Sequence, residues 1–360
     1  MKIKTITCHD VYNAGAGLQA YALARYLREQ GHDVQIIDYK PDYLSRHYSL
    51  TTVNNPKYDR PLIRQAYLLA KLPGRLRALS SERKKRFDRF RSEMLELTSK
   101  RYESNDALKA DLPEADVYIA GSDQIWNPLF PNGKDPAFFL DFVPEGKKKI
   151  SYAASFAVDE LPAEDCSRMQ PWLRNLDAIA VREKSGVQLL DQMGLSGIQV
   201  CDPVFLLDKQ AWAQMVVPQE IGVLVYDFDA SDTVTQIARK LSEDGKRITS
   251  VFPMAQADQV LEQMGPLEFM SAVAQADVVV SNSFHATAFA LIFHKEFFVL
   301  ERRERINTRM RDLLESVGLG DRMICSVEDM AQAAAIDWAD VDEKLGRQIE
   351  QSKRYLEQNL

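Results

Sequence analysis

The sequence predicts an α/β protein made of two Rossmann-like domains that face each other across a cleft. Segments with strand-like and helix-like patterns alternate along the chain, which is typical of parallel sheets covered by helices. The chain has 360 residues, too many for one ordinary core and enough for two domains of middling size. Its composition, 46% hydrophobic and 27% charged, excludes a disordered chain, a collagen-like repeat and a coiled coil.

The N-terminal domain, expected over residues 1–165, opens with a strand–helix–strand unit. Residues 2–7 alternate polar and apolar side chains like a strand, and residues 17–29 carry leucines and tyrosines along one helical face. Gly31 ends that helix, and residues 33–38 predict a second strand. Two short apolar segments predict further strands at residues 117–120 and 149–153.

The C-terminal domain, expected over residues 177–330, repeats the alternation, with the domain boundary between residues 160 and 178. The predicted strands are residues 178–181, 198–201, 222–226, 247–251, 277–281 and 297–300. The predicted helices are residues 183–193, 231–241, 267–275 and 285–293. A last polar helix over residues 336–360 is expected to pack back on the N-terminal domain.

Residues 60–101 break the alternation, since they are helical in pattern, strongly basic and rich in leucine. The run from Glu82 to Arg91 alone carries six basic residues. We interpret the segment as a helical arm inserted into the N-terminal domain, because runs of charge usually lie on a solvated face. The alternative is a helix that lies on an anionic membrane surface or an acidic partner.

Charge, cysteines and hydropathy exclude several classes of protein. The net charge of −7, from 45 Lys and Arg against 52 Asp and Glu, excludes general binding to nucleic acid. The four cysteines lack metal-ligand spacing, which indicates reduced thiols and no structural zinc. No apolar run approaches the roughly 20 residues of a membrane helix, and the N-terminus lacks a signal-peptide core. We expect a cytoplasmic protein that meets a membrane, if at all, through residues 60–101 at its inner face.

The first motif that could carry chemistry is Asn13-Ala-Gly-Ala-Gly-Leu-Gln-Ala20, at the start of the first helix. Gly15 and Gly17 match a dinucleotide-binding fingerprint, and Asp38 ends the next strand as a ribose-binding acid would. The long loop before the glycines favours close packing there instead, with a polar substrate over the helix N-terminus. Binding of NAD(P) is the alternative.

The second motif, Gly121-Ser-Asp-Gln-Ile-Trp-Asn-Pro128, follows the strand predicted at residues 117–120. An indole can stack on a sugar ring while carboxylate and amide groups bind its hydroxyls. This motif therefore suits the lip of a sugar-binding cleft. The alternative is a loop with a buried tryptophan and a capping aspartate.

The third motif, Val278-Val-Val-Ser-Asn-Ser-Phe-His-Ala-Thr287, is the most informative. A buried strand delivers three short polar residues to the start of an apolar helix, where free N–H groups and the helix dipole favour an anion. A histidine there can exchange a proton with substrate near neutral pH. His285 is therefore the main catalytic candidate, and His9, at the end of the first strand, is the other histidine that we retain.

Arginines near His285 suggest a small, multiply charged anion, because a guanidinium binds phosphate or carboxylate through two parallel hydrogen bonds. Arg182 lies between a strand and a helix of the C-terminal domain. Four more follow the strand after the His285 helix, namely Arg302, Arg303, Arg305 and Arg309. We expect at least two of these four to be ordinary solvated side chains.

Together these motifs resemble the polysaccharide pyruvyl transferase family over nearly the whole chain. The resemblance rests on residues 13–23, 37–41, 121–127, 151–156, 181–183, 202–203, 283–285 and 307–309. It implies a fold similar to B-type glycosyltransferases, and transfer of an enolpyruvyl-derived group from phosphoenolpyruvate to a sugar hydroxyl of a cell-surface polysaccharide or its precursor. The implied partners are phosphoenolpyruvate and a saccharide acceptor, free or lipid-linked. No cofactor is expected, and no DxD-like pair marks a metal site.

The resemblance also implies residue roles, with one notable departure. Better-studied members carry an arginine where this chain has Ser283, so other arginines must meet the charge of the donor. His285 is expected to act as acid and base. The residues expected to bind phosphoenolpyruvate are Arg182, Asn282, Ser283 and Arg309. The residues expected on the acceptor side are Asn13, Gln19, Asp123, Trp126 and Asn127.

Two other functions stay open at this point. One is a glycosyltransferase on the same scaffold that uses a nucleotide sugar, and the other is a non-catalytic sugar-binding protein of the polysaccharide machinery. Stabilisation by phosphoenolpyruvate, by UDP or GDP sugars, or by neither would distinguish the three.

Overall fold

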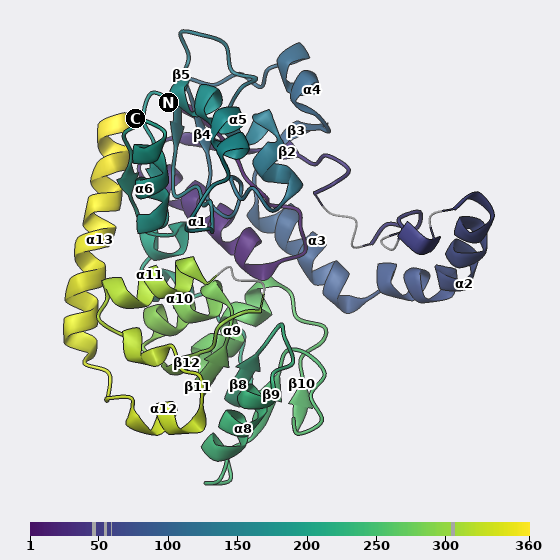
Figure 1. Cartoon of the computed structure of the whole chain (residues 1–360), viewed down its shortest axis with the longest axis vertical. Helices are drawn as coiled ribbons and strands as arrows, with labels where there is room; N and C mark the ends of the chain where they lie inside the picture. Colours follow the sequence, from purple (N-terminus) through teal and green to yellow (C-terminus); the bar gives the residue numbers. More distant parts are fainter. Residues whose placement is uncertain (45–47, 54–55, 59, 304–306) are drawn as a thin grey trace.

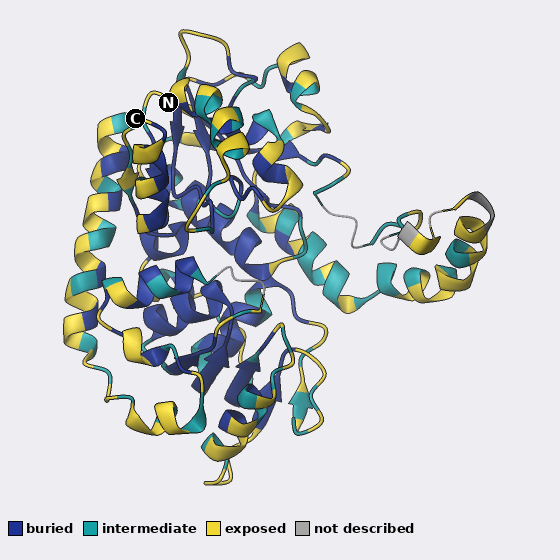
Figure 2. Ribbon diagram, in the orientation of Figure 1, coloured by how far each residue is buried: buried dark blue, intermediate teal, exposed yellow. Residues whose placement is uncertain are grey.

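Two parallel sheets flanked by helices form the two halves of the computed structural model (Figure 1). The structure describes residues 1–44, 48–53, 56–58, 60–303 and 307–360. The sheets lie one above the other in Figure 1, and the C-terminal helix runs along the side of both. Figure 2 shows that the strands of both sheets are largely buried, whereas the outer helices are exposed on one side.

The N-terminal sheet has the strand order β3-β2-β1-β4-β5, and every neighbouring pair is parallel. In the central strand, Ile3 lies opposite Val34 on one side and Val117 on the other. Helix α1 (Ala14–Glu29) follows β1, and the Asn13 side chain caps it by accepting from the Ala16 N–H. The strands are β1 (Lys2–Ile6), β2 (Asp33–Tyr39), β3 (Leu97–Tyr102), β4 (Val117–Ala120) and β5 (Lys148–Ser151).

Residues 177–201, expected in the C-terminal domain, continue the N-terminal sheet instead. Ala178 bridges Ile150, and Val181 bridges Ala154, so β6 (Ala180–Val181) runs beside the end of β5. After α6 (Lys184–Gln192), β7 (Ile198–Gln199) pairs with β6. The chain therefore crosses to the second sheet only after Cys201. The boundary predicted between residues 160 and 178 is too early, because this short strand–helix–strand unit has no distinctive linker after it.

The C-terminal sheet has the order β10-β9-β8-β11-β12, again with parallel neighbours. Its strands are β8 (Gly222–Tyr226), β9 (Ile248–Ser250), β10 (Gln259–Val260), β11 (Ala276–Ser281) and β12 (Glu296–Val299). Its main helices are α8 (Asp232–Leu241), α9 (Pro266–Gln275), α10 (Phe284–Phe293) and α11 (Thr308–Ser316). Apart from the short β10, this follows the alternation predicted from the sequence.

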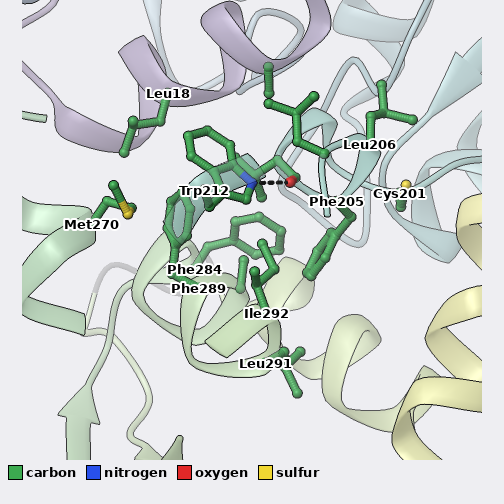
Figure 3. Packing of buried hydrophobic residues seen from close by; sticks show 14 of the residues in the cluster. Leu18, Cys201, Phe205, Leu206, Trp212, Met270, Phe284, Phe289, Leu291 and Ile292 are labelled. Carbon is green, nitrogen blue, oxygen red and sulfur yellow. Dashed lines mark hydrogen bonds between the residues drawn. The ribbon is translucent and has the colours of Figure 1, made fainter. Parts of the chain in front are cut away.

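One apolar core joins the two domains through α1. Figure 3 shows Trp212 between Leu18 of α1 and Phe289 of α10, and all three side chains are buried. The Trp212 ring meets the Phe289 ring edge-on at 5.0 Å, and its Nε1 donates to the Val204 carbonyl over 2.9 Å. Burial of rings of this size contributes about 2 kcal/mol each. The core therefore fixes how the carboxyl ends of the two sheets face each other.

The C-terminal helix α13 (Trp338–Asn359) spans both domains rather than only the first. Near its end, the Tyr355 hydroxyl donates to the Ser151 carbonyl over 2.9 Å. Near its start, His294 of the C-terminal domain stacks on Trp338 and lies 2.9 Å from Asp342. Since it touches each domain along its length, α13 braces their relative position.

The basic arm divides into parts with different surroundings. Helix α2 (Pro61–Leu79) projects away from the body, and Leu69 on it is 70% exposed (Figures 1 and 2). Helix α3 (Glu82–Met94) returns and buries Phe90 against Tyr21 of α1. Residues 97–101, predicted as part of the arm, belong to the edge strand β3. The inserted arm is therefore shorter than predicted from its basic composition.

Short helices fill the remaining connections. They are η1 (Pro56–Tyr58), α4 (Asn105–Ala110), η2 (Pro131–Lys134), η3 (Pro136–Phe139), α5 (Ala163–Arg174), η4 (Pro203–Leu206), α7 (Lys209–Ala213), η5 (Gly320–Arg322) and α12 (Val327–Gln332). Across the described residues, no helix is both long enough and apolar enough to span a bilayer.

Candidate active site

A cavity of about 350 Å³ lies between the domains, at the carboxyl ends of strands from both sheets. The N-terminal domain lines it with Asn13 and Asp123, and the C-terminal domain with His285 and Arg309, among others. Ligands of parallel α/β sheets bind in this position, outside the carboxyl ends of the strands. The cavity is therefore the candidate active site.

His285 enters the cavity wall in the first turn of α10. The Ser283 hydroxyl caps this helix by accepting from the Ala286 N–H, directly after β11 ends. The imidazole faces the start of α1 in the other domain, so closely that a Cβ on Gly15 would lie 2.0 Å from its Nδ1. The missing side chain of Gly15 thus makes room for His285. The imidazole fills the space above this glycine that a dinucleotide pyrophosphate would need.

Asp202 supports the other side of the imidazole. Its Oδ2 lies 3.6 Å from His285 Nε2 and 2.9 Å from Arg182 Nη2, and it is almost completely buried. Burial alone would raise the pKa of Asp202, but the Arg182 charge and His285 outweigh burial and lower it to about 2. A buried carboxylate therefore stays ionised beside His285, on the Nε2 side of its ring.

Two buried arginines flank the Phe284 ring. The Arg182 guanidinium lies 4.8 Å from the ring centroid and the Arg309 guanidinium 5.4 Å from it. Burial, together with the like charge of Arg182, lowers the pKa of Arg309 to about 10, although Asp123 at 3.5 Å counteracts this. Arg309 stays charged near neutral pH, so positive charge gathers on both sides of Phe284 in the cavity wall.

Buried polar atoms without a hydrogen-bond partner gather at this wall and directly behind it. Within the described ranges they include Arg182 Nε and Nη1, Arg309 Nε and His285 Nε2. Glu183 contributes another, its Oε2, and burial raises the pKa of Glu183 against the opposing charge of Arg182. Buried polar groups are normally hydrogen-bonded, so this concentration marks a place for a polar ligand or water.

Arg309, Asn282 and Ser283 line the cavity, as expected for donor-binding residues, but Arg182 does not. Its guanidinium is held by Asp202 and donates to the Ser122 hydroxyl over 2.5 Å. The expectation of direct donor contact by Arg182 is corrected: its charge acts from behind Phe284. The Asn282 amide is also engaged, donating to Asp227 over 2.6 Å.

On the acceptor side, Asn13 and Asp123 line the cavity. Asp123 has a φ of 72°, in the left-handed region that a side chain seldom adopts. Such backbone strain is often found at functional sites.

The structure does not bring the other three predicted acceptor-side residues to the cavity. Trp126 is fully buried, stacks on Phe139 at 5.4 Å and donates its Nε1 to the Phe138 carbonyl. Asn127 is fully buried and donates to the Gln124 side chain. Stacking of Trp126 on a sugar is therefore wrong, because the loop turns inward and its indole fills the core of the N-terminal domain.

Gln19 is also fully buried, where its side chain donates to Thr7 and to the Ala16 carbonyl. Its polarity stabilises the connection between β1 and α1, so the predicted acceptor contact is corrected. His9, the second histidine retained, lies outside the cavity and pairs with Asp38 at 3.3 Å. Asp38, the ribose-binding candidate, is thus already engaged.

The remaining arginine candidates divide. Arg302 lines the cavity with its guanidinium 4.5 Å from the Phe228 ring, whereas Arg303 does not line it. Arg305 lies outside the described residues.

The sequence analysis did not predict the roles of Asp202, Gly15 and Phe228. Only Asp202 had a local signal, because Asp202-Pro203 is one of the segments on which the family resemblance rests.

Among the residues that the structure describes, no group of three or more His, Cys, Asp or Glu side chains could hold a metal ion. A metal-independent reaction stays a prediction, to be tested by chelation.

Comparison with protein families shows which family the chain resembles. The model of the family "Polysaccharide pyruvyl transferase" matches residues 13–304, most of the chain. Comparison with curated protein sequences gives no match.

Solved structures share the fold at low sequence identity. A Listeria monocytogenes protein assigned as a UDP-N-acetylglucosamine 2-epimerase has a TM-score of 0.55 at 11% identity, over 97% of this chain and 90% of its own. MnaA of S. aureus, solved with UDP, has a TM-score of 0.52 at 11% identity, over 97% and 90% of the two chains. These similarities establish the fold alone. The predicted arrangement of two Rossmann-like domains is confirmed.

Proposed function

Because this chain belongs to the polysaccharide pyruvyl transferase family and is a transferase, we propose that it moves the enolpyruvyl-derived group of phosphoenolpyruvate to a saccharide hydroxyl. The acceptor is a cell-surface polysaccharide or its precursor, free or lipid-linked. The observation that carries this proposal is the positive charge at the cavity, where Arg309 lines the wall next to His285 and Arg182 lies behind Phe284.

The donor is a small, multiply charged anion, and the cavity wall has matching chemistry. Arg309 binds its phosphate or carboxylate directly, while the Ser283 hydroxyl and the start of α10 offer further donors. Bound negative charge offsets the effects of burial and of the Arg182 charge, which together lower the pKa of Arg309. The unpartnered Nε of Arg309 gains a hydrogen bond.

His285 is the proton carrier of the reaction. It gives a proton to the methylene carbon of phosphoenolpyruvate, and the neighbouring carbon accepts the oxygen of an acceptor hydroxyl. His285 takes back a proton from that hydroxyl, and the bond between this carbon and the phosphate oxygen breaks. A second acceptor hydroxyl can then close the ketal, and its proton passes to the leaving phosphate. Asp202 is a positioning residue, since it holds the imidazole 3.6 Å away without reaching the cavity.

The direct test is release of inorganic phosphate from phosphoenolpyruvate across a panel of saccharide acceptors. We expect acceptor-dependent release that EDTA leaves unchanged, and a decrease of about 10²- to 10⁴-fold in His285→Ala. Full phosphate release by that variant would refute the role of His285. Stabilisation by UDP or GDP sugars, without stabilisation by phosphoenolpyruvate, would refute the proposal and indicate a glycosyltransferase that uses a nucleotide sugar.

We also place the protein in the cytoplasm, with α2 at an anionic membrane surface. Residues 60–94 carry eleven Lys or Arg against three Asp or Glu, although the whole chain has a net charge of −7. On α2 this charge accompanies exposed leucines, Leu69 and Leu76. Basic helices with exposed apolar residues are typical of membrane-surface contact.

A further inference from the structure

A second cavity, of about 400 Å³, adjoins the candidate active site. The two cavities share Asn13 from the N-terminal domain and Phe228 from the C-terminal domain. The second cavity extends toward the base of the arm, where Phe87 of α3 and Tyr12 form part of its wall. A substrate that reacts beside His285 and is larger than one sugar can therefore continue into this space.

The C-terminal wall of the second cavity is a group of three aromatic rings at the ends of β8 and β9. Tyr226, Phe228 and Phe252 lie 4.8 to 5.5 Å apart between centroids, with tilted planes. Phe228 is 37% exposed and Phe252 is 38% exposed. Adjacent large apolar side chains with this much exposure mark a binding surface rather than a core.

Polar groups interrupt the aromatic lining and decide which ligand it suits. Arg83, Glu262 and Gln263 line the same cavity as the rings. The Arg83 guanidinium already donates to the Tyr48 hydroxyl and the Tyr12 carbonyl, and the Gln263 side chain accepts from the Arg83 N–H, so the exposed Glu262 carboxylate decides between ligands. A lipid tail would desolvate this carboxylate, and the carboxylate would repel the diphosphate of a nucleotide sugar. A sugar ring, with an apolar C–H face and hydroxyls around its edge, matches both the rings and the polar groups.

We propose that this aromatic cavity binds a pyranose ring of the saccharide acceptor, next to the sugar that is modified beside His285. The assignment of this cavity as an acceptor subsite rests on the proposed function. The rings of Phe228 and Phe252 take the role that the sequence assigned to Trp126, whose indole is buried in the N-terminal core.

The test is saturation-transfer NMR of the full chain with methyl pyranosides of gluco, galacto and manno configuration, and with UDP as the nucleotide probe. We expect the strongest transfer to the C–H protons of one pyranoside face. In Phe228→Leu and Phe252→Leu, which stay apolar but lose the ring, affinity should fall roughly 5- to 10-fold. Phe228→Tyr and Phe252→Tyr, which keep a ring, should retain binding.

Val217→Ala is the matched control, because Val217 is 43% exposed in the same domain and lines neither cavity. It should bind pyranosides like the unmodified chain. The proposal is overturned if no pyranoside receives saturation, if the leucine variants bind as well as the tyrosine variants, or if UDP displaces the pyranosides from the rings.

Thermal stabilisation by phosphoenolpyruvate, measured on the same samples, separates the two proposals. Ring-dependent pyranoside binding without that stabilisation supports the sugar site and counts against the pyruvyl donor. Stabilisation by phosphoenolpyruvate with no ring-dependent sugar binding supports the donor and overturns the aromatic subsite.

Discussion

His285 owes its position to a residue of the other domain. Gly15 leaves no room for a side chain in front of the imidazole, since its Cβ would lie 2.0 Å from Nδ1. Gly17, two residues along the same helix, faces Phe90 of the arm instead, and a Cβ built on it would lie 3.1 Å from that ring. Two glycines that look equivalent in the sequence thus have different roles. Gly15 makes room for the imidazole of His285, and Gly17 allows helix α3 to pack closely on α1.

We predict that Gly15→Ala displaces His285 and lowers phosphate release by about 10²-fold or more, without lowering stability through the helix itself. Alanine favours a helix over glycine by about 1 kcal/mol, so unfolding of α1 is not the cause of the loss. Phosphate release and thermal denaturation, measured side by side, test this. Gly17→Ala is the control on the same helix, and equal activity losses in the two variants would contradict the role of Gly15.

Asp202 makes the free energy of unfolding depend on pH in the acid range. Its pKa is lowered to about 2 from the ordinary 3.8, because the charge of Arg182 outweighs burial. A lowered pKa stabilises the fold above about pH 4, and this contribution, about 2 kcal/mol, is lost as the pH falls toward 2.

We therefore predict that the free energies of unfolding of the native chain and Asp202→Asn approach each other by about 2 kcal/mol between pH 5 and pH 2. Denaturant unfolding at a series of pH values measures this, and the difference between the chains cancels the other titrating groups. A difference that is independent of pH would show that Asp202 is not an ionised partner of Arg182.

At the scale of elements, α2 departs most from the rest of the fold. It carries four basic residues and no acidic one, but Arg64 and Arg75 donate to backbone carbonyls of residues 50–52. Lys71 and Arg77 are exposed, as are Leu69 and Leu76. The outer surface of this helix therefore combines positive charge with apolar side chains.

We predict that the protein binds vesicles of phosphatidylglycerol, and that Lys71→Glu with Arg77→Glu weakens this binding at least tenfold, since each basic residue contributes about 1 kcal/mol near such a surface. Vesicle flotation in low and high salt measures it, and salt should release the protein. Arg347→Glu, on the exposed face of α13, is the control. Equal binding to neutral phosphatidylcholine vesicles would rule out an electrostatic contact.

At the scale of the whole molecule, the donor would bind where the two domains meet. Arg309 reaches the cavity from the C-terminal domain, 3.5 Å from Asp123 of the N-terminal domain. A ligand there stabilises the folded, assembled state in proportion to its occupancy.

We predict that phosphoenolpyruvate at about 100 times its Kd stabilises the protein by about 3 kcal/mol, seen as a higher Tm. Arg309→Ala should lose this shift and Arg309→Lys should keep part of it, because the charge remains while the two-pronged geometry is lost. Differential scanning fluorimetry measures the shift. An unchanged shift in Arg309→Ala would show that the donor binds elsewhere.

The local pattern of the chain determined much of this protein. Alternating strands and helices predicted both sheets, because the side-chain period of a segment sets which face it buries. The motif at residues 278–287 predicted where His285 lies, since a strand that leads into an apolar helix places its polar residues at the helix start whatever the rest of the fold does.

Only the tertiary structure decided what depends on contacts between distant segments. Whether Trp126 faces a sugar or the core depends on Phe139 and its neighbours, and whether Arg182 reaches the donor depends on Asp202. The domain boundary depends on which sheet accepts β6 and β7. Strand pairing, ring stacking and burial each require two partners that are distant in the sequence. The local pattern of one segment does not show the second partner, so it cannot determine the role of the residue.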